Sequence, residues 1–177
     1  TTTRTIIVKD GPDADAEIRI QTVVVTSDDG LTNTIYTDFD GGADTAAKSG
    51  FDRIETIQKT YSTNGDVVTT DSVKAQNNTL LTKTQTTVSG DGLTTTVVVD
   101  RDGSGSFDVT GKTTKTHHDN GDSTVTSSST TTAGAFISGE ITKIENDGRT
   151  VTTTRSEFGQ FADDTWTLVG GEKVVRS

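Results

Sequence analysis

The segment DRDGSGSFD has the residue types and spacing of a loop that binds a metal ion through oxygen atoms. Asp100, Asp102, Ser104 and Asp108 fall at positions 1, 3, 5 and 9 of this loop, and Ser106 at position 7 offers its backbone carbonyl. Ca²⁺ takes about six to eight such oxygens, and a loop with alternating short polar side chains supplies them. We therefore predict a calcium site at this loop.

The loop departs from an EF-hand in one important position. Gly105 stands at position 6, where such a loop turns sharply, but position 12 is Gly111 instead of a bidentate Glu. The pattern also indicates no flanking helix. Asp108 or a neighbouring unit must then complete the ligand shell, and the alternative interpretation is a solvated Asp/Gly turn.

Two further segments carry alternating acids. DFDGGAD, followed by SGFD, resembles the first loop with an insertion, and its candidate metal ligands are Asp38, Asp40, Asp44 and Asp52. The segment DGPDADAE supplies a third set, which is Asp10, Asp13, Asp15 and Glu17. Because closely spaced carboxylates repel one another, a cation among them would be favourable. The remaining acids beside Gly or Asn are explained by turn chemistry alone.

Asn-Gly and Asp-Gly dipeptides divide the chain into hairpins. Five of these dipeptides mark the boundaries of the units, and most of the five are followed by a run rich in Thr and Val; they begin at Asp29, Asn64, Asp91, Asn120 and Asp147. Such a dipeptide between β-branched runs is the strongest short-range hairpin signal. The dipeptides predict a single repeat domain over 1–177 of about six strand-loop-strand units, at 1–28, 29–63, 64–90, 91–119, 120–146 and 147–177. Similar sequences in alternate units indicate a longer repeat of about 56–62 residues.

Composition favours an all-β fold with a small core. Thr accounts for 39 of the 177 residues, whereas hydrophobic residues make up only 28%, against about 45–50% in a usual domain. We expect a tandem antiparallel hairpin array, closed on itself or folded into a β-sandwich, with a parallel β-roll or β-solenoid as the alternative. Alternation in IRIQTVVV, residues 18–25, predicts one buried face that includes Ile18, Ile20 and Val24.

Charge and residue types exclude several functions. A net charge of −10 argues against a nucleic-acid surface and against binding to anionic membranes. No apolar run is long enough to span a membrane. The absence of Cys excludes thiolate metal sites and a Cys nucleophile. His117 and His118 are the only histidines and lack convergent partners, and no catalytic motif is present, so we expect no enzymatic activity.

Asp-Gly-x-Thr turns, DxDGxGxFD loops and Thr-rich strands together resemble the calcium-binding tandem repeats of large secreted bacterial adhesins of the repeats-in-toxin type. The family's nonapeptide GGxGxDxUx is absent, and the segment 41–44 is only a fragment of it. The resemblance implies bound Ca²⁺, secretion to the cell surface, neighbouring repeats of the same chain as partners, and a role as extender or adhesive segment with a cell-surface or matrix ligand.

Two alternatives stay open at the level of sequence. Thr-x-Thr strings on strands could form a flat ligand-binding or ice-binding module, although Thr is also simply a suitable residue for an exposed strand. The third possibility is a non-catalytic module of a secreted enzyme. The first residues, TTTRTIIVKD, look like the interior of a protein, so we expect this chain to be a segment of a longer one.

Overall fold

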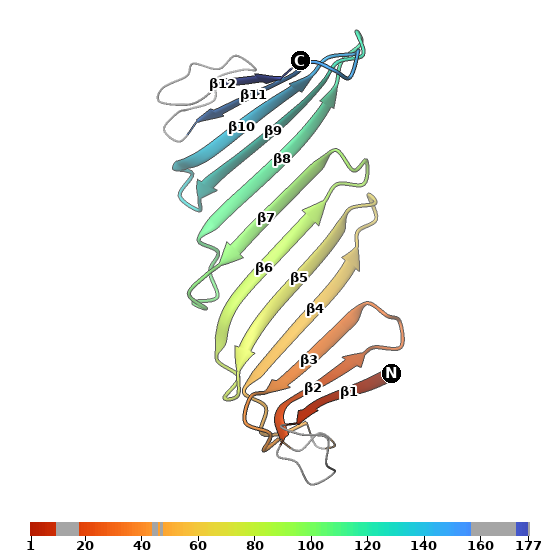
Figure 1. Cartoon of the computed structure of the whole chain (residues 1–177), viewed down its shortest axis with the longest axis vertical. Helices are drawn as coiled ribbons and strands as arrows, with labels where there is room; N and C mark the ends of the chain where they lie inside the picture. Colours follow the sequence, from red (N-terminus) through yellow and green to blue (C-terminus); the bar gives the residue numbers. More distant parts are fainter. Residues whose placement is uncertain (10–17, 44–45, 47, 157–172, 177) are drawn as a thin grey trace. The chain divides into compact units, whose positions relative to one another are not determined.

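The computed structural model describes residues 1–9, 18–43, 46, 48–156 and 173–176, and every regular element in this part of the chain is a β-strand (Figure 1). The strands are β1 (Thr2–Lys9), β2 (Ile18–Thr26), β3 (Thr32–Asp38), β4 (Arg53–Tyr61), β5 (Val67–Ala75), β6 (Leu80–Val88), β7 (Thr94–Asp100), β8 (Val109–His117), β9 (Ser123–Thr131), β10 (Phe136–Ile144), β11 (Val151–Ser156) and β12 (Lys173–Arg176).

The strands follow one another in the order of the chain, and the pairs from β1 to β4 and from β7 to β12 are all antiparallel. The predicted antiparallel hairpin array is therefore confirmed, and the parallel β-roll alternative is wrong. The described strands belong to one open sheet, so the expected closure of the array on itself and the β-sandwich are wrong as well. Two compact units can be separated by their internal contacts: Thr1–Tyr61, Val68–Gln85 and Asp100–Ser106 in one, and Ser62–Val67, Thr86–Val99 and Phe107–Ser177 in the other.

Four consecutive strands make up the structural repeat. The strands β4, β5 and β6 have nine residues each, and β8, β9 and β10 recur with the same length 56 residues later in the chain. The seven-residue strand β3 recurs as β7 after 62 residues. The six-residue difference lies in the loop between β3 and β4, where the sequence indicates an insertion.

The same type of turn precedes β3 and β7, the first strands of the two repeats. In the turn between β2 and β3, Asp29 accepts a hydrogen bond from the Ser27 hydroxyl at 2.5 Å and another from the Leu31 amide at 2.9 Å. These bonds, the Ser27 hydroxyl first, lower the pKa of Asp29 below its ordinary value. Asp91 repeats both bonds between β6 and β7. The interpretation of these acids as turn residues is therefore supported.

The core is smaller than predicted, and in the first unit it lies on the other face. Among the described residues only Val23 and Phe51 are buried hydrophobic side chains, whereas Ile20, which we expected in the core, is 39% exposed. The loop after β3 brings the Phe51 ring to 5.4 Å from that of Tyr36, and Tyr36 lies opposite Val23 in the register. This ring covers the face of Gln21 and Val23, so the assignment of Ile20 and Val24 to the buried face is wrong. The register irregularity at Arg19 places Ile18 on the same face as Gln21 and Val23, where it is half-buried.

Close backbone approach explains Gly103 in the loop between β7 and β8. Gly103 has φ +71°, and a Cβ there would lie 2.1 Å from the carbonyl oxygen of Leu80, whereas Gly105, with φ +88°, has open space around it. Both positions lie in the left-handed region, which costs an L-residue about 1–2 kcal/mol. Gly41 makes the equivalent approach to the carbonyl of Ile18 in the first repeat.

We expect Gly103→Ala to destabilise the chain by about 2–5 kcal/mol, because it adds an overpacking cost of about 1–3 kcal/mol to the left-handed strain. Gly105→Ala is the matched control and should cost about 1–2 kcal/mol, since it has the strain without the clash. Urea unfolding followed by circular dichroism measures both. Equal losses for the two variants would show that the loop does not lie against the start of β6.

Candidate metal centres

The first candidate centre lies where β3 ends and β4 begins. Thr37 pairs with Arg53 in the antiparallel register, so the next residues outward, Asp38 and Asp52, face each other at the strand ends. Asp40 joins them from the loop, and one carboxylate oxygen from each of the three lies within 4.8 Å of the others. Asp38 is buried, Asp52 is half-buried and Asp40 is exposed, so the cluster opens outward from the sheet.

Backbone amides hold the carboxylate of Asp38 in its charged form. The amides of Asp40 and Ala43 donate to its two oxygens at 3.0 and 2.8 Å. Burial opposes ionisation, but these hydrogen bonds outweigh it and hold the pKa of Asp38 below its ordinary value. The Phe39 amide donates to an oxygen of Asp52 at 2.9 Å. Asp38 therefore stays anionic at neutral pH.

The second candidate centre has the same construction between β7 and β8. Val99 pairs with Val109, which sets Asp100 and Asp108 opposite each other at the strand ends. Asp102 completes a triad with oxygens within 4.8 Å, and the burial again falls from Asp100 through Asp108 to Asp102. Asp100 has no exposed surface.

The donors to the second triad are again loop amides. Those of Gly103 and Gly105 donate to the two oxygens of Asp100, both at 2.8 Å. The Ser104 amide and hydroxyl lower the pKa of Asp102. Two equivalent places in the repeat thus present the same arrangement of one buried and two more accessible carboxylates.

The chemistry of both triads is that of a hard-cation site. All candidate ligands are oxygen atoms, which suit Ca²⁺, Mg²⁺ or Mn²⁺ and do not favour thiophilic metals. Three carboxylates at such short separations repel one another, and a bound cation would offset that repulsion. Both triads can hold a metal ion.

The other predicted ligands divide into two groups. Ser104 and Ser106 lie in the second loop, exposed, with the Ser104 hydroxyl 3.4 Å from the Ser106 carbonyl oxygen and 3.3 Å from the Ser106 amide. Their role as ligands stays a prediction. The remaining members lie outside the described residues, and they are Asp10, Asp13, Asp15, Glu17 and Asp44.

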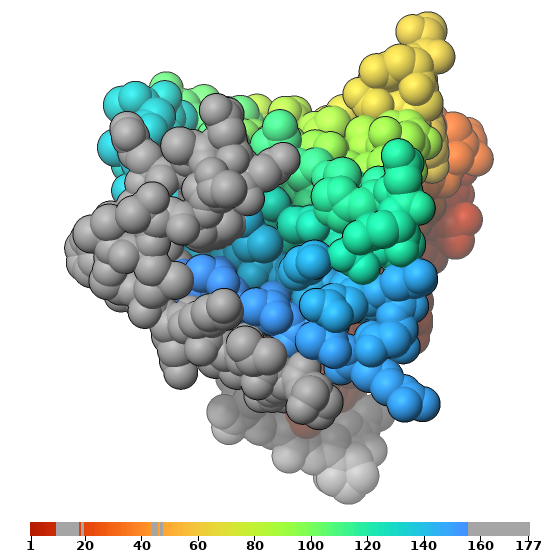
Figure 2. All heavy atoms as spheres, turned by 90° about the horizontal axis from the view of Figure 1, so that it is seen from above, coloured from red at the N-terminus to blue at the C-terminus, as the bar shows by residue number. Residues whose placement is uncertain are grey.

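The Asp of each Asn-Gly-Asp turn connects that turn to a neighbouring one, a role that was not predicted from the sequence. Asp122 accepts a hydrogen bond from the Asn146 amide at 3.0 Å and an ion pair from Lys143 at 3.1 Å, so the turns 118–122 and 145–148 lie side by side (Figure 2, blue-green and blue). Asp66 accepts the equivalent bond from Gly90 at 2.9 Å. Only the repeated Asn-Gly-Asp triplet signals this contact in the sequence.

The histidines and the threonine strings form no centre of their own in the described part of the chain. His117 and His118 bond to the hydroxyls of Ser123 and Thr124, at 3.0 and 2.8 Å. Thr94, Thr114 and Thr126 form a cross-strand row, but Ile141 occupies its next position. The row is therefore too short for an extended hydroxyl array.

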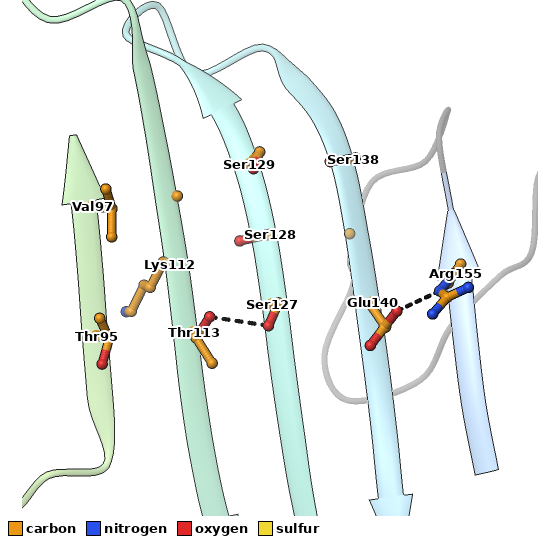
Figure 3. Close-up of a pocket in the computed structure, with 12 residues that line it drawn as sticks. Thr95, Val97, Lys112, Thr113, Ser127, Ser128, Ser129, Ser138, Glu140 and Arg155 are labelled. Atoms are coloured by element: carbon orange, nitrogen blue, oxygen red, sulfur yellow. Dashed lines mark hydrogen bonds and ion pairs between the residues drawn. The ribbon is translucent and has the colours of Figure 1, made fainter. Parts of the chain in front are cut away.

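A shallow hollow of about 370 Å³ lies on one face of β7 to β11 (Figure 3). Small side chains such as Ser127 and Ser129 form its floor, and the Thr113 hydroxyl lies 3.0 Å from that of Ser127. Glu140 and Arg155 close one side with an ion pair of 2.5 Å. The Thr113 and Ser127 hydroxyls thus bond to each other, and so do the Glu140 and Arg155 side chains. The lining contains no aromatic ring on which a sugar would stack.

Comparison of the chain with protein-family models, with characterised proteins and with solved structures finds no match. Within the described residues, no helix has the length and apolar character needed to cross a membrane.

Proposed function

We propose that this chain is a calcium-stabilised structural repeat and that it serves as a spacer or extender segment of a secreted, cell-surface protein. The observation that carries the proposal is the recurrence of one acidic triad at equivalent strand ends, with a fully buried Asp38 in the first and a fully buried Asp100 in the second. A buried carboxylate is costly unless it is hydrogen-bonded or paired with a cation.

Calcium fits these loops better than magnesium does. The loop of the second triad carries the exposed Ser104 and Ser106, and Ca²⁺ accepts about six to eight oxygens in flexible geometry. Mg²⁺ requires a near-octahedral shell with shorter bonds and gives up its water reluctantly. Three carboxylates fill only part of a calcium shell, and further oxygen ligands or water would complete it.

The small core gives calcium a structural purpose. With only Val23 and Phe51 as buried hydrophobic residues in the described part, little apolar burial holds the strands together. An ion bound by Asp38 and Asp52 would connect the ends of two neighbouring strands, and one bound by Asp100 and Asp108 would do the same in the next repeat. Such a chain would remain loosely folded at cytosolic calcium and become rigid at the millimolar calcium found outside cells.

A calorimetric titration tests this proposal. We expect CaCl₂ to bind at both described triads with micromolar to sub-millimolar affinity, and MgCl₂ at the same concentrations to release much less heat. Absence of calcium binding at millimolar concentrations, or equal binding of the two ions, would contradict the calcium proposal.

A further inference from the structure

The first and last described strands each have one open edge. β1 pairs only with β2, and β12 pairs only with β11, among the strands that the structure describes. β1 is exposed along its whole length, and Ile6, Ile7 and Val8 are 42%, 46% and 50% exposed. An open edge with apolar side chains is a template for pairing with another strand.

The register identifies the place of β1 in the four-strand repeat. In the β1–β2 pair, seven residues of β1 pair in succession before the register skips Arg19 of β2. In the β9–β10 pair, seven residues of β9 pair in succession before the register skips Ile137 of β10. The same irregularity at the same place makes β1 the counterpart of β9, with Thr2 corresponding to Ser123.

The strand at the opposite edge, β12, is the counterpart of β8, which is the strand that pairs with β9 inside the repeat. β11 follows the Asp147-Gly148 turn as β7 follows Asp91-Gly92, and β12 pairs with β11 antiparallel as β8 pairs with β7. β12 is therefore the counterpart of β8, and its four residues correspond to 110–113 of that strand.

The interior β8–β9 pairing now shows what each open edge would accept. β9 lies antiparallel beside β8 along its whole length. The open edge of β12 is thus the place for a strand of the β9 kind, and β1 is such a strand. The antiparallel β8–β9 pairing, transferred to this edge, sets β1 of a second copy antiparallel to β12.

We propose that β12 of one copy of this chain pairs with β1 of a second copy and continues the antiparallel array from molecule to molecule. The β8–β9 register, transferred to this interface, sets Val174 opposite Val8 and Val175 opposite Ile7. The contact is head-to-tail, so it leaves an open β1 and an open β12 at the ends and produces linear chains of copies.

The net charge makes the interface sensitive to salt. Each copy carries a net charge of −10, so two copies repel each other at low ionic strength. Screening by added salt should therefore promote the association.

Engineered disulfides test both the pairing and its register, because the chain has no cysteine of its own. Directly opposed residues of antiparallel strands have Cα atoms about 4.5–5.5 Å apart, within the range that a disulfide spans. Under mild oxidation, Val8→Cys with Val174→Cys should give a ladder of disulfide-linked oligomers. Val8→Cys with Val175→Cys is the control and should stay mostly monomeric, since a shift of one residue places the thiols on opposite faces.

Mixing two single variants excludes a disulfide within one chain, and it allows the folding of each variant to be checked separately. Equal amounts of Val8→Cys and Val174→Cys chains, each confirmed as folded by circular dichroism, should form a covalent dimer that contains one of each, as mass spectrometry shows. Oligomers formed equally by the control pair, a fast-migrating cross-linked monomer in the double variant, or no mixed dimer would each overturn the proposal.

Discussion

Removing calcium should lower the melting temperature of this chain by about 10–20 °C. An ion that binds only the folded state adds about 2.7 kcal/mol per site at 100 times its dissociation constant, and the described residues contain two candidate sites. For a chain of this length, each kcal/mol corresponds to about 2–4 °C. Thermal unfolding by circular dichroism in 10 mM CaCl₂ and in EGTA measures the difference.

Magnesium is the control for this experiment. Addition of MgCl₂ to the chelated protein restores ionic strength and divalent charge without the larger coordination shell of calcium. We expect it to recover only a small part of the lost stability. Identical melting curves in calcium and in EGTA would show that the Asp loops are ordinary turns.

Replacing the two fully buried carboxylates, Asp38 and Asp100, should abolish the response to calcium. In Asp38→Asn with Asp100→Asn each side chain keeps an oxygen that can accept amide hydrogen bonds, but both triads lose their most buried charge. The variant should melt at nearly the same temperature with and without calcium. The measurement is the difference between the two melting temperatures, which separates the lost ion from any general destabilisation.

Asp29→Asn with Asp91→Asn is the matched control. These two residues also occupy equivalent places in the repeat, and each also accepts a hydrogen bond from a backbone amide of its turn. Neither of them belongs to an acidic triad. The control should melt at a somewhat lower temperature and keep the full calcium response. If both double variants lost the response equally, calcium would act on the overall negative charge and not at the two triads.

The hairpins and the acidic loops were predictable because local chemistry determines them. The Asp-Gly turn at Asp91 is built from contacts within five residues, among Ser89, Asp91, Leu93 and Thr94. In the loop that follows β7, the alternation of Asp100, Asp102 and Asp108 is visible in the sequence and places the three carboxylates together.

Contacts between distant residues were not predictable in the same way. The wrong face of β2 was assigned to the core because both faces carry apolar residues, and only the position of Phe51 against Tyr36 decides between them. The bond from the Asn146 amide to Asp122 spans 24 residues and depends on the register of β9 and β10. Gly103 likewise has no sequence signature for its approach to Leu80.

The calcium titration tests the central claim most directly when it is followed at individual amides by ¹⁵N-resolved NMR. Binding at the triads predicts that the amide signals of Ala43, Gly103 and Gly105 shift and saturate together, because these groups donate to Asp38 and Asp100. The turn amides of Leu31 and Leu93 should change little, since they donate to acids outside the triads. Shifts that are absent at millimolar calcium, or that are as large at Leu31 and Leu93 as in the loops, would contradict calcium binding at the two acidic triads.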